Sequence, residues 1–488
     1  MSKKNIAGRD QEMKKLQRAS DSGKAEFIAV YGRRRVGKTF LIREFFGERI
    51  CFEIVGIHDA TTQEQLVNFS NSLAEAFDTK LPLQVPKSWQ DAFTLLKAFL
   101  QNKKTKGKKV VFFDELPWLN TPWSGFLKHL ENFWNSFGSK QNDLVLIVCG
   151  SAASWMIQHI MDSRGGLHNR LTGQIRLLPF NLSETKDYLY KKNVRNLDHY
   201  QILQLYMAIG GVPYYLSFVQ PGLSAAQIID EMFFSKGAQL RDEYDNLFGS
   251  LFNHNEHHKR LVETLSRKKK GLNRNELLLA MELSSGGTAS NIIRELETSG
   301  FIESYIPYGK NASEALFRLS DEFILFHFKW IVPLGKRQAG NSYWLKKQTG
   351  SKFSTWSGYC FESICLKHIE QIKYHLRIDK IDSTNSPWEY RSTGKTGEEG
   401  AQIDMLIDRQ DMVINLCEMK FCQTEYSIGS AYAKDLRRKI EVFRNQTHSK
   451  KSIFLTIVTT FGLKENFHSI SLNAIGVSMD ALFEQVSS

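Results

Sequence analysis

A single stretch, residues 27–46, restricts most strongly what this chain can fold into. It reads FIAVYGRRRVGKTFLIREFF, and residues 32–39 match the pattern G-x-x-x-x-G-K-[ST]. The apolar run before Gly32 is typical of a buried strand, and the apolar spacing after Thr39 is typical of a helix. A strand, a glycine-rich turn and a helix bind phosphate, because backbone N–H groups and the positive helix end face the anion. The stretch therefore predicts a phosphate-binding loop. The alternative is a glycine turn that happens to precede Lys-Thr.

The loop predicts ATP and Mg²⁺ as cofactors. Lys38 would reach the β- and γ-phosphates, and the Thr39 hydroxyl would hold Mg²⁺. Gly8-Arg9 opens an earlier helix, which would pack on the adenine or be a plain N-terminal helix. The residues expected to contact the nucleotide are Gly8, Arg9, Gly32, Arg33, Arg34, Arg35, Val36, Gly37, Lys38, Thr39, Phe40 and Ser151.

A second fixed point is KVVFFDELPWL, residues 109–119, where a buried-type strand ends in Asp114-Glu115. In an open α/β sheet, chemistry lies beyond the carboxyl ends of the strands. We expect Asp114 to bind Mg²⁺ and Glu115 to polarise the attacking water. A solvated acidic turn is the alternative.

Two further strands are expected at residues 144–149 and 175–180. Ser151 follows the first of them and would sense the γ-phosphate or the catalytic water. Arg170 is a candidate to act on the nucleotide of a neighbouring subunit, which implies a homo-oligomer. The alternative for Arg170 is a surface arginine.

Length and composition bound the rest. A chain of 488 residues is too long for one core and predicts three or four domains. The net charge of +12 permits a polyanionic partner such as nucleic acid without requiring one. The six cysteines are too sparse in a chain of this length to indicate a disulfide scaffold, and their spacings match a zinc site poorly. With no signal-like start and no apolar run of membrane-spanning length, we expect a soluble, cytoplasmic protein without a membrane partner.

The middle of the chain predicts helices and a winged helix-turn-helix. Helical spacing covers residues 183–207 and 222–238, with Gly210-Gly211-Val212-Pro213 between them. Residues 257–318 then fit three helices, the last at 288–298, and a hairpin turning near Gly309. Residues 257–310 contain nine lysines and arginines and six glutamates, a net charge of +3. On the third helix, however, Arg294 is accompanied by Glu295 and Glu297. DNA binding by this part and a purely interdomain role both remain open.

The last part carries a second set of polar residues. A helix over 358–376 contains Glu362, a strand over 401–408 contains Asp404, and a strand over 412–421 contains Glu418 and Lys420. Glu418 and Lys420 share one strand face, because side chains alternate. Asp404 and Glu418, with Glu362, would hold Mg²⁺, and Lys420 would orient water or phosphate. A cross-strand ion pair is the alternative. A downstream helix with Lys434, Arg437, Arg438 and Lys439 would follow a phosphate backbone or be solvated.

The motifs YGRRRVGKT, FFDELPWL, CGSAASWM, the Arg170 region and GGVPYY, in that order, resemble the archaeal-type ATPase family. That family belongs to the AAA+-related, signal-transducing branch of P-loop NTPases. In the family a glycine-proline element closes a helical lid against the nucleotide, so the resemblance implies that Pro213 contacts the nucleotide. The Asp404-x13-Glu418-x-Lys420 spacing resembles the PD-(D/E)XK nuclease superfamily. The resemblances imply an α/β multidomain fold with a RecA/AAA-like parallel sheet. The expected parts are a P-loop ATPase domain (1–180), a helical lid (181–245), a winged helix (246–332), a linker (333–350) and a restriction-endonuclease-like α/β domain (351–488).

These features predict a switch protein that binds and hydrolyses Mg²⁺-ATP. Its nucleotide state would control a nucleic-acid-binding, nuclease-like C-terminal region, with DNA as the expected nucleic acid. One alternative is an ATP-regulated module that binds DNA, or a protein through the winged helix, with a catalytically silent nuclease fold. Another is a defence or toxin-like effector nuclease.

Overall fold

The computed structural model describes residues 5–79, 83–162, 169–252, 254–335, 342–348, 350–392 and 399–486. The chain forms two compact units. One comprises residues 1–179 with 249–253, and the other comprises residues 180–248 with 254–488.

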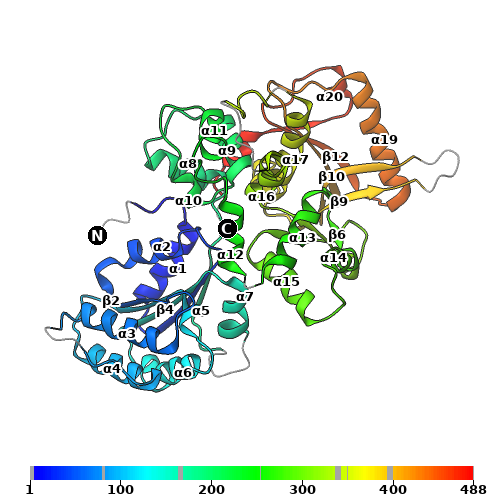
Figure 1. The fold of residues 1–488 in the computed structure, drawn as a ribbon. Coiled ribbons are helices and arrows are strands. Elements are labelled where there is room, and N and C mark those ends of the chain that lie inside the picture. Colours follow the sequence, from blue (N-terminus) through cyan, green and yellow to red (C-terminus); the bar gives the residue numbers. More distant parts are fainter. Residues whose placement is uncertain are drawn as a thin grey trace. The chain divides into compact units, whose positions relative to one another are not determined.

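The first unit is a parallel five-stranded sheet in the order β2-β3-β4-β1-β5. Its strands are β1 (Glu26–Tyr31), β2 (Ile50–Val55), β3 (Lys109–Asp114), β4 (Leu144–Gly150) and β5 (Gly173–Arg176). Apolar side chains cover both faces, as expected for a parallel sheet. One face packs on α1 (Asp10–Asp21) and α2 (Lys38–Phe46). The other packs on α3 (Thr62–Ala76), α4 (Trp89–Asn102) and α6 (Phe126–Ser136), as Figure 1 shows.

The predicted parallel α/β architecture of this unit is confirmed, with two differences. Strand β2, a short stretch in which Glu53 interrupts an otherwise apolar run, was not predicted. The last strand ends at Arg176 instead of running over 175–180. Beyond it the Leu177 backbone passes so close to Gly32 that a Cβ on Gly32 would lie 2.1 Å from the Leu177 carbonyl oxygen. With a φ of +151° as well, position 32 requires glycine.

The second unit begins with helices α8 (Leu182–Lys191), α9 (His199–Ile209), α10 (Pro213–Leu216) and α11 (Ala225–Phe233), followed in the chain by α12 (Glu243–Leu251). The helix predicted over 183–207 is two helices, because Asp198 caps a new one by accepting from the Gln201 N–H. The Gly210-Gly211 turn packs on Phe180. A Cβ on Gly211 would lie 1.8 Å from the Phe180 carbonyl oxygen, so this turn admits no larger residue.

Three helices and a small antiparallel sheet follow. The helices are α13 (Glu256–Ser266), α14 (Arg274–Met281) and α15 (Gly287–Thr298), close to the predicted bounds. The sheet has the order β6-β8-β7, from β6 (Leu272–Asn273), β7 (Ile302–Tyr305) and β8 (Leu316–Leu319). We call residues 302–319 the wing. Next come α16 (Glu322–Phe326) and a π-helical turn (His327–Ile331). Within the linker predicted over 333–350, Trp344 is buried against Trp330 and Trp356, whereas residues 345–347 are exposed.

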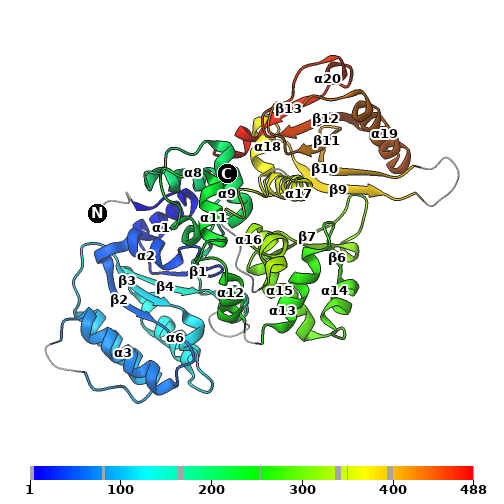
Figure 2. The same cartoon turned by 45° about the horizontal axis from the view of Figure 1, so that its top comes forward.

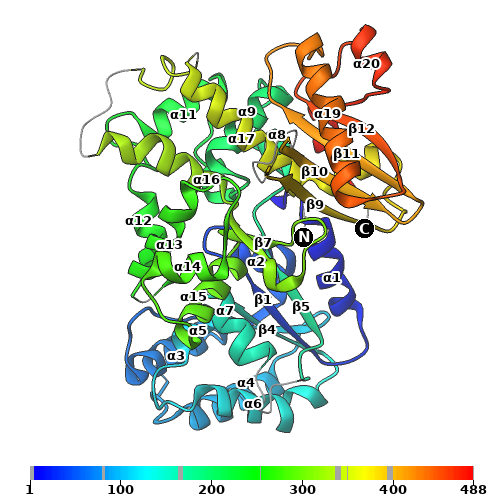
Figure 3. The ribbon, with the colours of Figure 1, turned by 90° about the vertical axis from the view of Figure 1, so that its right-hand side faces the viewer.

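The final part is a second five-stranded sheet in the order β13-β12-β11-β10-β9. Strands β9 to β11 pair antiparallel, whereas β11 to β13 pair parallel. In Figures 2 and 3, α17 and α19 lie on opposite faces of this sheet. Its elements are α17 (Ser351–Lys367), α18 (Ile369–His375), β9 (Ser383–Tyr390), β10 (Ala401–Arg409), β11 (Val413–Lys420), α19 (Ser430–Thr447), β12 (Ser452–Thr459), α20 (Phe467–Ser471) and β13 (Ile475–Ser478).

Some elements of this part differ from those predicted. The helix expected over 358–376 starts earlier and is divided at His368, and β9 was not predicted. Short helices complete the described chain: α5 (Leu116–Leu119), α7 (Ala153–Met156), a π-helical turn (Ile157–Met161), and 3-10 turns at Gly47–Arg49, Gly138–Lys140, Ala312–Glu314, Val332–Leu334 and Met479–Phe483. No helix in the described ranges is long and apolar enough to cross a membrane.

Two buried histidines predict acid sensitivity of the second unit. The His368 Nε2 accepts from the Leu182 N–H at 3.1 Å, which requires the unprotonated form. Burial lowers the pKa of His368 to about 4, and it lowers the pKa of His327, stacked on Tyr244, to about 4 as well. An unfolded histidine titrates near 6.5, so between these values the unfolded chain binds more protons and stability falls as pH falls.

From pH 7 to pH 5 each histidine should lower the free energy of unfolding by about 2 kcal/mol. Denaturant unfolding of wild type and His368→Gln at both pH values measures this loss. A glutamine can still accept from Leu182 but does not titrate, so the variant should lose less stability on acidification. An identical loss in the two proteins would contradict the assignment.

Candidate functional site

The phosphate loop joins β1 to α2 and surrounds a buried lysine. Lys38 is 5% exposed, and its Nζ donates to the carbonyl oxygens of Gly32 at 2.9 Å and Arg33 at 3.0 Å. Gly37, with a φ of +88°, precedes α2 and has no side chain to cover its first N–H groups. No acidic residue lies in the first turn of α2. The loop therefore presents a positive helix end and an ammonium group to an anion.

The ends of α2 and β3 meet beside this loop. The Thr39 hydroxyl donates to Asp114 Oδ2 at 2.6 Å, and the Glu115 N–H donates to Asp114 Oδ1 at 2.9 Å. Asp114 is 2% exposed. A hydroxyl and a carboxylate in contact are oxygen donors of the kind that Mg²⁺ takes with a nucleotide. These two residues fit the predicted metal.

Glu115 joins the ends of β3 and β4. Its Oε2 accepts from the Ser151 N–H at 3.1 Å and from the Ser151 hydroxyl at 2.8 Å. Glu115 also has a φ of +46°, a left-handed conformation that is uncommon outside glycine. Such conformations concentrate at functional sites, where the surrounding structure holds them. The structure thus brings together Glu115 and Ser151, which follow the neighbouring strands β3 and β4.

Two other residues predicted to bind the nucleotide, Arg9 and Arg34, make defined contacts in this region. Arg9 is buried, and its Nη2 donates to the Val36 carbonyl oxygen at 3.2 Å, so the Gly8-Arg9 segment touches the loop. The Arg34 guanidinium lies 5.5 Å from the centre of the Trp118 ring. Sequence reasoning gave no separate role to Arg33, Arg34 and Arg35. Trp118, which follows Asp114-Glu115 in the sequence, was the one feature that could have indicated a contact for Arg34.

Within the described part of the chain, the predicted roles of Phe40, Arg170 and Pro213 rest on no contact with the phosphate loop. Phe40 is half exposed on α2. Arg170 is exposed on the first unit, and its action on a neighbouring subunit stays a prediction. Pro213 starts α10 in the second unit, and its contact with nucleotide also stays a prediction.

Glu115→Gln should separate binding from hydrolysis. The amide oxygen can still accept from Ser151, but glutamine cannot take a proton from water. We expect ATP hydrolysis to fall about 100-fold or more while the ATP dissociation constant changes by less than about threefold. Titration with a fluorescent ATP analogue and a phosphate-release assay measure the two quantities. A parallel loss of both would show that Glu115 serves nucleotide binding.

A second polar cluster lies in the C-terminal sheet, and a β-bulge positions its first member. The register between β9 and β10 shifts between Ile403 and Leu406, so Asp404 and Met405 both face Pro387. Proline has no N–H to donate, which suits it to a bulge on an edge strand. At the bulge Asp404 turns toward β11, and its Oδ2 accepts from the Met419 N–H at 3.0 Å.

Glu418 on β11 is fully buried and has partners at both carboxylate oxygens. Oε1 lies 2.7 Å from Lys439 Nζ, while Oε2 accepts from the Tyr432 hydroxyl at 2.7 Å and lies 3.5 Å from Lys420 Nζ. Tyr432 was missed from sequence, and Lys439 was assigned only to a helix face. Both belong to α19, and a spacing of seven places them on one face of that helix. That spacing was the only signal.

Burial and neighbouring charge raise the pKa of two carboxyl groups in this part, Asp404 and Glu362. Burial raises the pKa of Asp404, and the nearby Glu418 charge raises it further. Burial and the Asp404 charge likewise raise the pKa of Glu362 on α17. The pKa of Tyr432 is raised by burial and by Glu418, so its hydroxyl stays a donor. Carboxylates in such surroundings ionise together only when a cation compensates them.

The cluster opens into a cavity of about 600 Å³. We call it the carboxylate cavity; it is lined by Glu389, Tyr390, Arg391, Ser392, Gly400, Ala401, Gln402, Asp404, Glu418, Lys420, Arg438 and Lys439. Glu362 does not line it. Among the described residues no three His, Cys, Asp or Glu side chains gather closely enough to hold a metal ion. Of the three predicted ligands, Asp404 and Glu418 line this cavity, whereas Glu362 does not, and its part in binding a metal stays a prediction.

Comparison with known proteins finds a family match over the first part of the chain. Residues 6–219 match the family described as an ATPase domain predominantly from Archaea, as the phosphate-loop motifs predicted. The match supports ATP binding and hydrolysis, and it agrees with the geometry around Lys38 and Asp114. It does not reach the C-terminal sheet, so the nuclease resemblance there stays a prediction.

Several relatives are similar over much of the chain. An uncharacterized protein of Methanocaldococcus jannaschii is 22% identical over 442 residues, covering 88% of this chain and 91% of that protein. A Walker-type ATPase of Pyrococcus abyssi is 16% identical with a TM-score of 0.48, covering 66% of this chain and 96% of that one. The ORC2 protein of Aeropyrum pernix, solved as ADPNP and ADP complexes, is 13% identical with a TM-score of 0.41, covering 67% and 95%.

Proposed function

We propose that this chain is an Mg²⁺-dependent ATP-hydrolysing switch whose nucleotide state controls a metal-dependent nucleic-acid-cleaving site. One observation carries the proposal. The chain holds two separate carboxylate sets, one beside a phosphate loop and one facing lysines in the C-terminal sheet. The first set has the chemistry to bind and hydrolyse ATP, and the second has the chemistry to bind a phosphodiester.

In the first set, each residue has one task. Thr39 and Asp114 would hold Mg²⁺, which offsets phosphate charge. Lys38, now bonded to the carbonyl oxygens of Gly32 and Arg33, would exchange them for phosphate oxygens. Glu115 would orient the attacking water while Ser151 fixes the carboxylate.

In the second set, the element order supports cleavage. The helix with Glu362 is α17, the strand with Asp404 is β10, and the strand with Glu418 and Lys420 is β11. They follow one another in the chain in this order, with α18 and β9 between the first two. This order is similar to that of PD-(D/E)XK nucleases. Asp404 and Glu418 would hold Mg²⁺, and Lys420 would orient water or stabilise the phosphate. The helices α13 to α15 and the wing would form the winged helix that connects the two activities.

A second candidate function has its own supporting observation. Both Glu418 oxygens are already bonded, and Lys439 supplies the cation that the buried carboxylate needs. A metal ion would have to displace that ammonium group. If it does not, the C-terminal sheet is catalytically silent and the chain is an ATP-regulated binding module.

One assay separates the two functions. The full-length protein is incubated with labelled single-stranded DNA, duplex DNA or RNA and with Mg²⁺ or Mn²⁺, each with and without ATP. The proposal expects cleavage that requires the divalent cation and changes with ATP. Cleavage of none of these substrates, in a preparation that hydrolyses ATP, establishes the silent form.

A further inference from the structure

We propose that the basic loop Lys268–Lys270 and the rim of the carboxylate cavity form one surface that holds a nucleic-acid backbone. We call helices α13 to α15 and the β6-β8-β7 sheet the middle module. On this surface the module contacts the polymer through the loop before β6, and not through α15. The inference rests on the proposed function and deepens it, because it names what the surroundings of the cavity bind and how.

The loop is joined to the wall of the cavity. Lys270 Nζ lies 2.5 Å from Glu389 Oε1, and Arg391 Nε lies 3.1 Å from the same oxygen. Glu389 and Arg391 both line the carboxylate cavity. The Lys270 carbonyl oxygen accepts from the Tyr305 hydroxyl at 2.6 Å. The loop is therefore fixed at the cavity rim.

Neighbouring contacts hold the same arrangement from the other side. The Lys269 carbonyl oxygen accepts from the Tyr359 hydroxyl on α17 at 3.4 Å, and Lys269 Nζ lies 5.6 Å from the centre of that ring. In the wing, the Tyr308 N–H donates to the Pro387 carbonyl oxygen at 3.2 Å. Pro387 is the residue opposite the Asp404 bulge. The module thus contacts the strand that positions Asp404.

The charge of this surface suits a polyanion. Four basic residues line the cavity, namely Arg391, Lys420, Arg438 and Lys439, against Glu389, Asp404 and Glu418. The exposed lysines 268–270 raise the balance to seven basic against three acidic residues. Glu418 is buried beneath Lys439 and Lys420 and offsets one of these positive charges, and the surface keeps an excess of basic residues. Regularly spaced phosphates meet this pattern.

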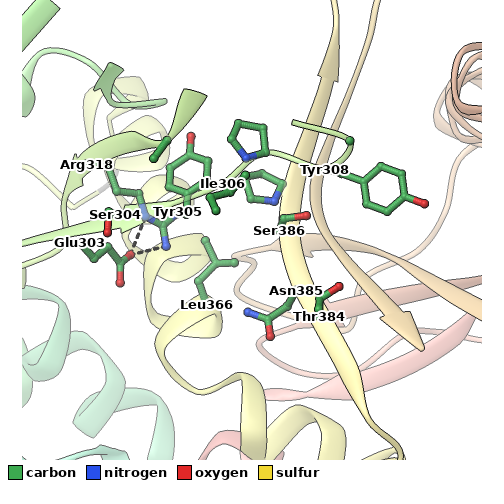
Figure 4. Close-up of a pocket in the computed structure, with 14 residues that line it drawn as sticks. Glu303, Ser304, Tyr305, Ile306, Tyr308, Arg318, Leu366, Thr384, Asn385 and Ser386 are labelled. Carbon is green, nitrogen blue, oxygen red and sulfur yellow. Dashed lines mark hydrogen bonds and ion pairs between the residues drawn. The ribbon is translucent and has the colours of Figure 1, made fainter. Parts of the chain in front are cut away.

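Basic groups elsewhere in the module are paired with neighbouring side chains, as Lys270 is with Glu389. On α15, Arg294 bonds to Asn291 and stands beside Glu295 and Glu297. Figure 4 shows a second cavity, between the wing and β9, in which Arg318 is held by Glu303. The Arg318 side chain is 13% exposed, against 43% for Lys270, so it offers less surface to a phosphate. The loop is the part of the module with three adjacent exposed lysines.

Salt-dependent binding tests the surface. Full-length Lys269→Ala/Lys270→Ala and a control, Arg294→Ala/Lys310→Ala, remove the same charge from the same module. Binding of a labelled DNA duplex of arbitrary sequence is measured by anisotropy across salt concentrations, with EDTA present so that no strand is cut. We expect the loop variant to lose about tenfold in affinity at physiological salt. The slope of log K against log salt should become shallower by about 1.8, for two lost phosphate contacts. The control should stay within about twofold of wild type.

Each other outcome overturns the inference. An equal loss in both variants would reflect net charge alone, and a loss only in the control would place the contact on α15 and the wing. Unchanged binding by the loop variant, or no binding by wild type at low salt, would exclude the surface. The test is independent of strand cleavage. Cleavage with a failed binding test would leave the proposed function standing, and binding without cleavage would leave the surface standing.

Discussion

Lys38→Ala is expected to abolish ATP hydrolysis, with a loss of about 100-fold or more in kcat/KM. The physical reason is the position of its ammonium group inside the phosphate loop, 2.9 Å from the Gly32 carbonyl oxygen. When ATP fills the loop, this charge would be the one that compensates the β- and γ-phosphates. Phosphate release with saturating ATP and Mg²⁺ measures the loss.

A matched control separates this effect from unfolding. Lys14 is exposed on α1, so Lys14→Ala removes the same charge from the same unit without touching the loop. It should hydrolyse ATP at the wild-type rate. Circular dichroism should show Lys38→Ala to be folded, because loss of this side chain exposes two loop carbonyl groups to water and leaves the sheet intact. Wild-type turnover in folded Lys38→Ala would refute the assignment of this loop.

How far the sequence predicts the fold depends on whether an element carries its own signal. The buried strands β3 and β4 are continuous apolar runs, which local pattern detects. The edge strand β9 reads STNSPWEY and is mostly polar, so nothing local marks it as a strand. It forms because β10 offers a ladder to pair with, which is information that lies elsewhere in the chain. The burial of Trp344 depends in the same way on Trp330 and Trp356.

The candidate sites follow the same rule. Lys38, Thr39 and Asp114 belong to compact motifs whose spacing carries the chemistry. In the structure Lys38 lies within the phosphate loop and Thr39 bonds to Asp114. Ser151 could be placed beside Glu115 because strand ends meet at one sheet edge. Tyr432 and Lys439 could not be assigned, since only the packing of α19 on β11 puts them on Glu418. Contacts that depend on tertiary packing, such as those of Tyr432 and Lys439 with Glu418, leave no recognisable pattern in the sequence of α19 or of β11.

Asp404→Asn is expected to remove divalent-dependent strand cleavage. Asp404 projects at a bulge toward β11, where its Oδ2 is fixed by the Met419 N–H. An amide keeps the shape but carries no charge, so it holds Mg²⁺ poorly beside Glu418. We expect cleavage to fall about 100-fold or more, while ATP hydrolysis stays near the wild-type rate, because Asp404 belongs to the second carboxylate set and not to the ATPase site.

Asp408→Asn is the matched control. It makes the same change on the same strand, at a carboxylate paired with Lys451 and outside the carboxylate cavity. Gel assays of labelled DNA and RNA with Mg²⁺ or Mn²⁺ should show cleavage by wild type and by Asp408→Asn but not by Asp404→Asn. Equal cleavage by all three would place the activity away from this cavity or in a contaminant. The bond between Glu418 and Lys439 would then be explained as the permanent neutralisation of a buried carboxylate, with no role for a metal ion at this sheet.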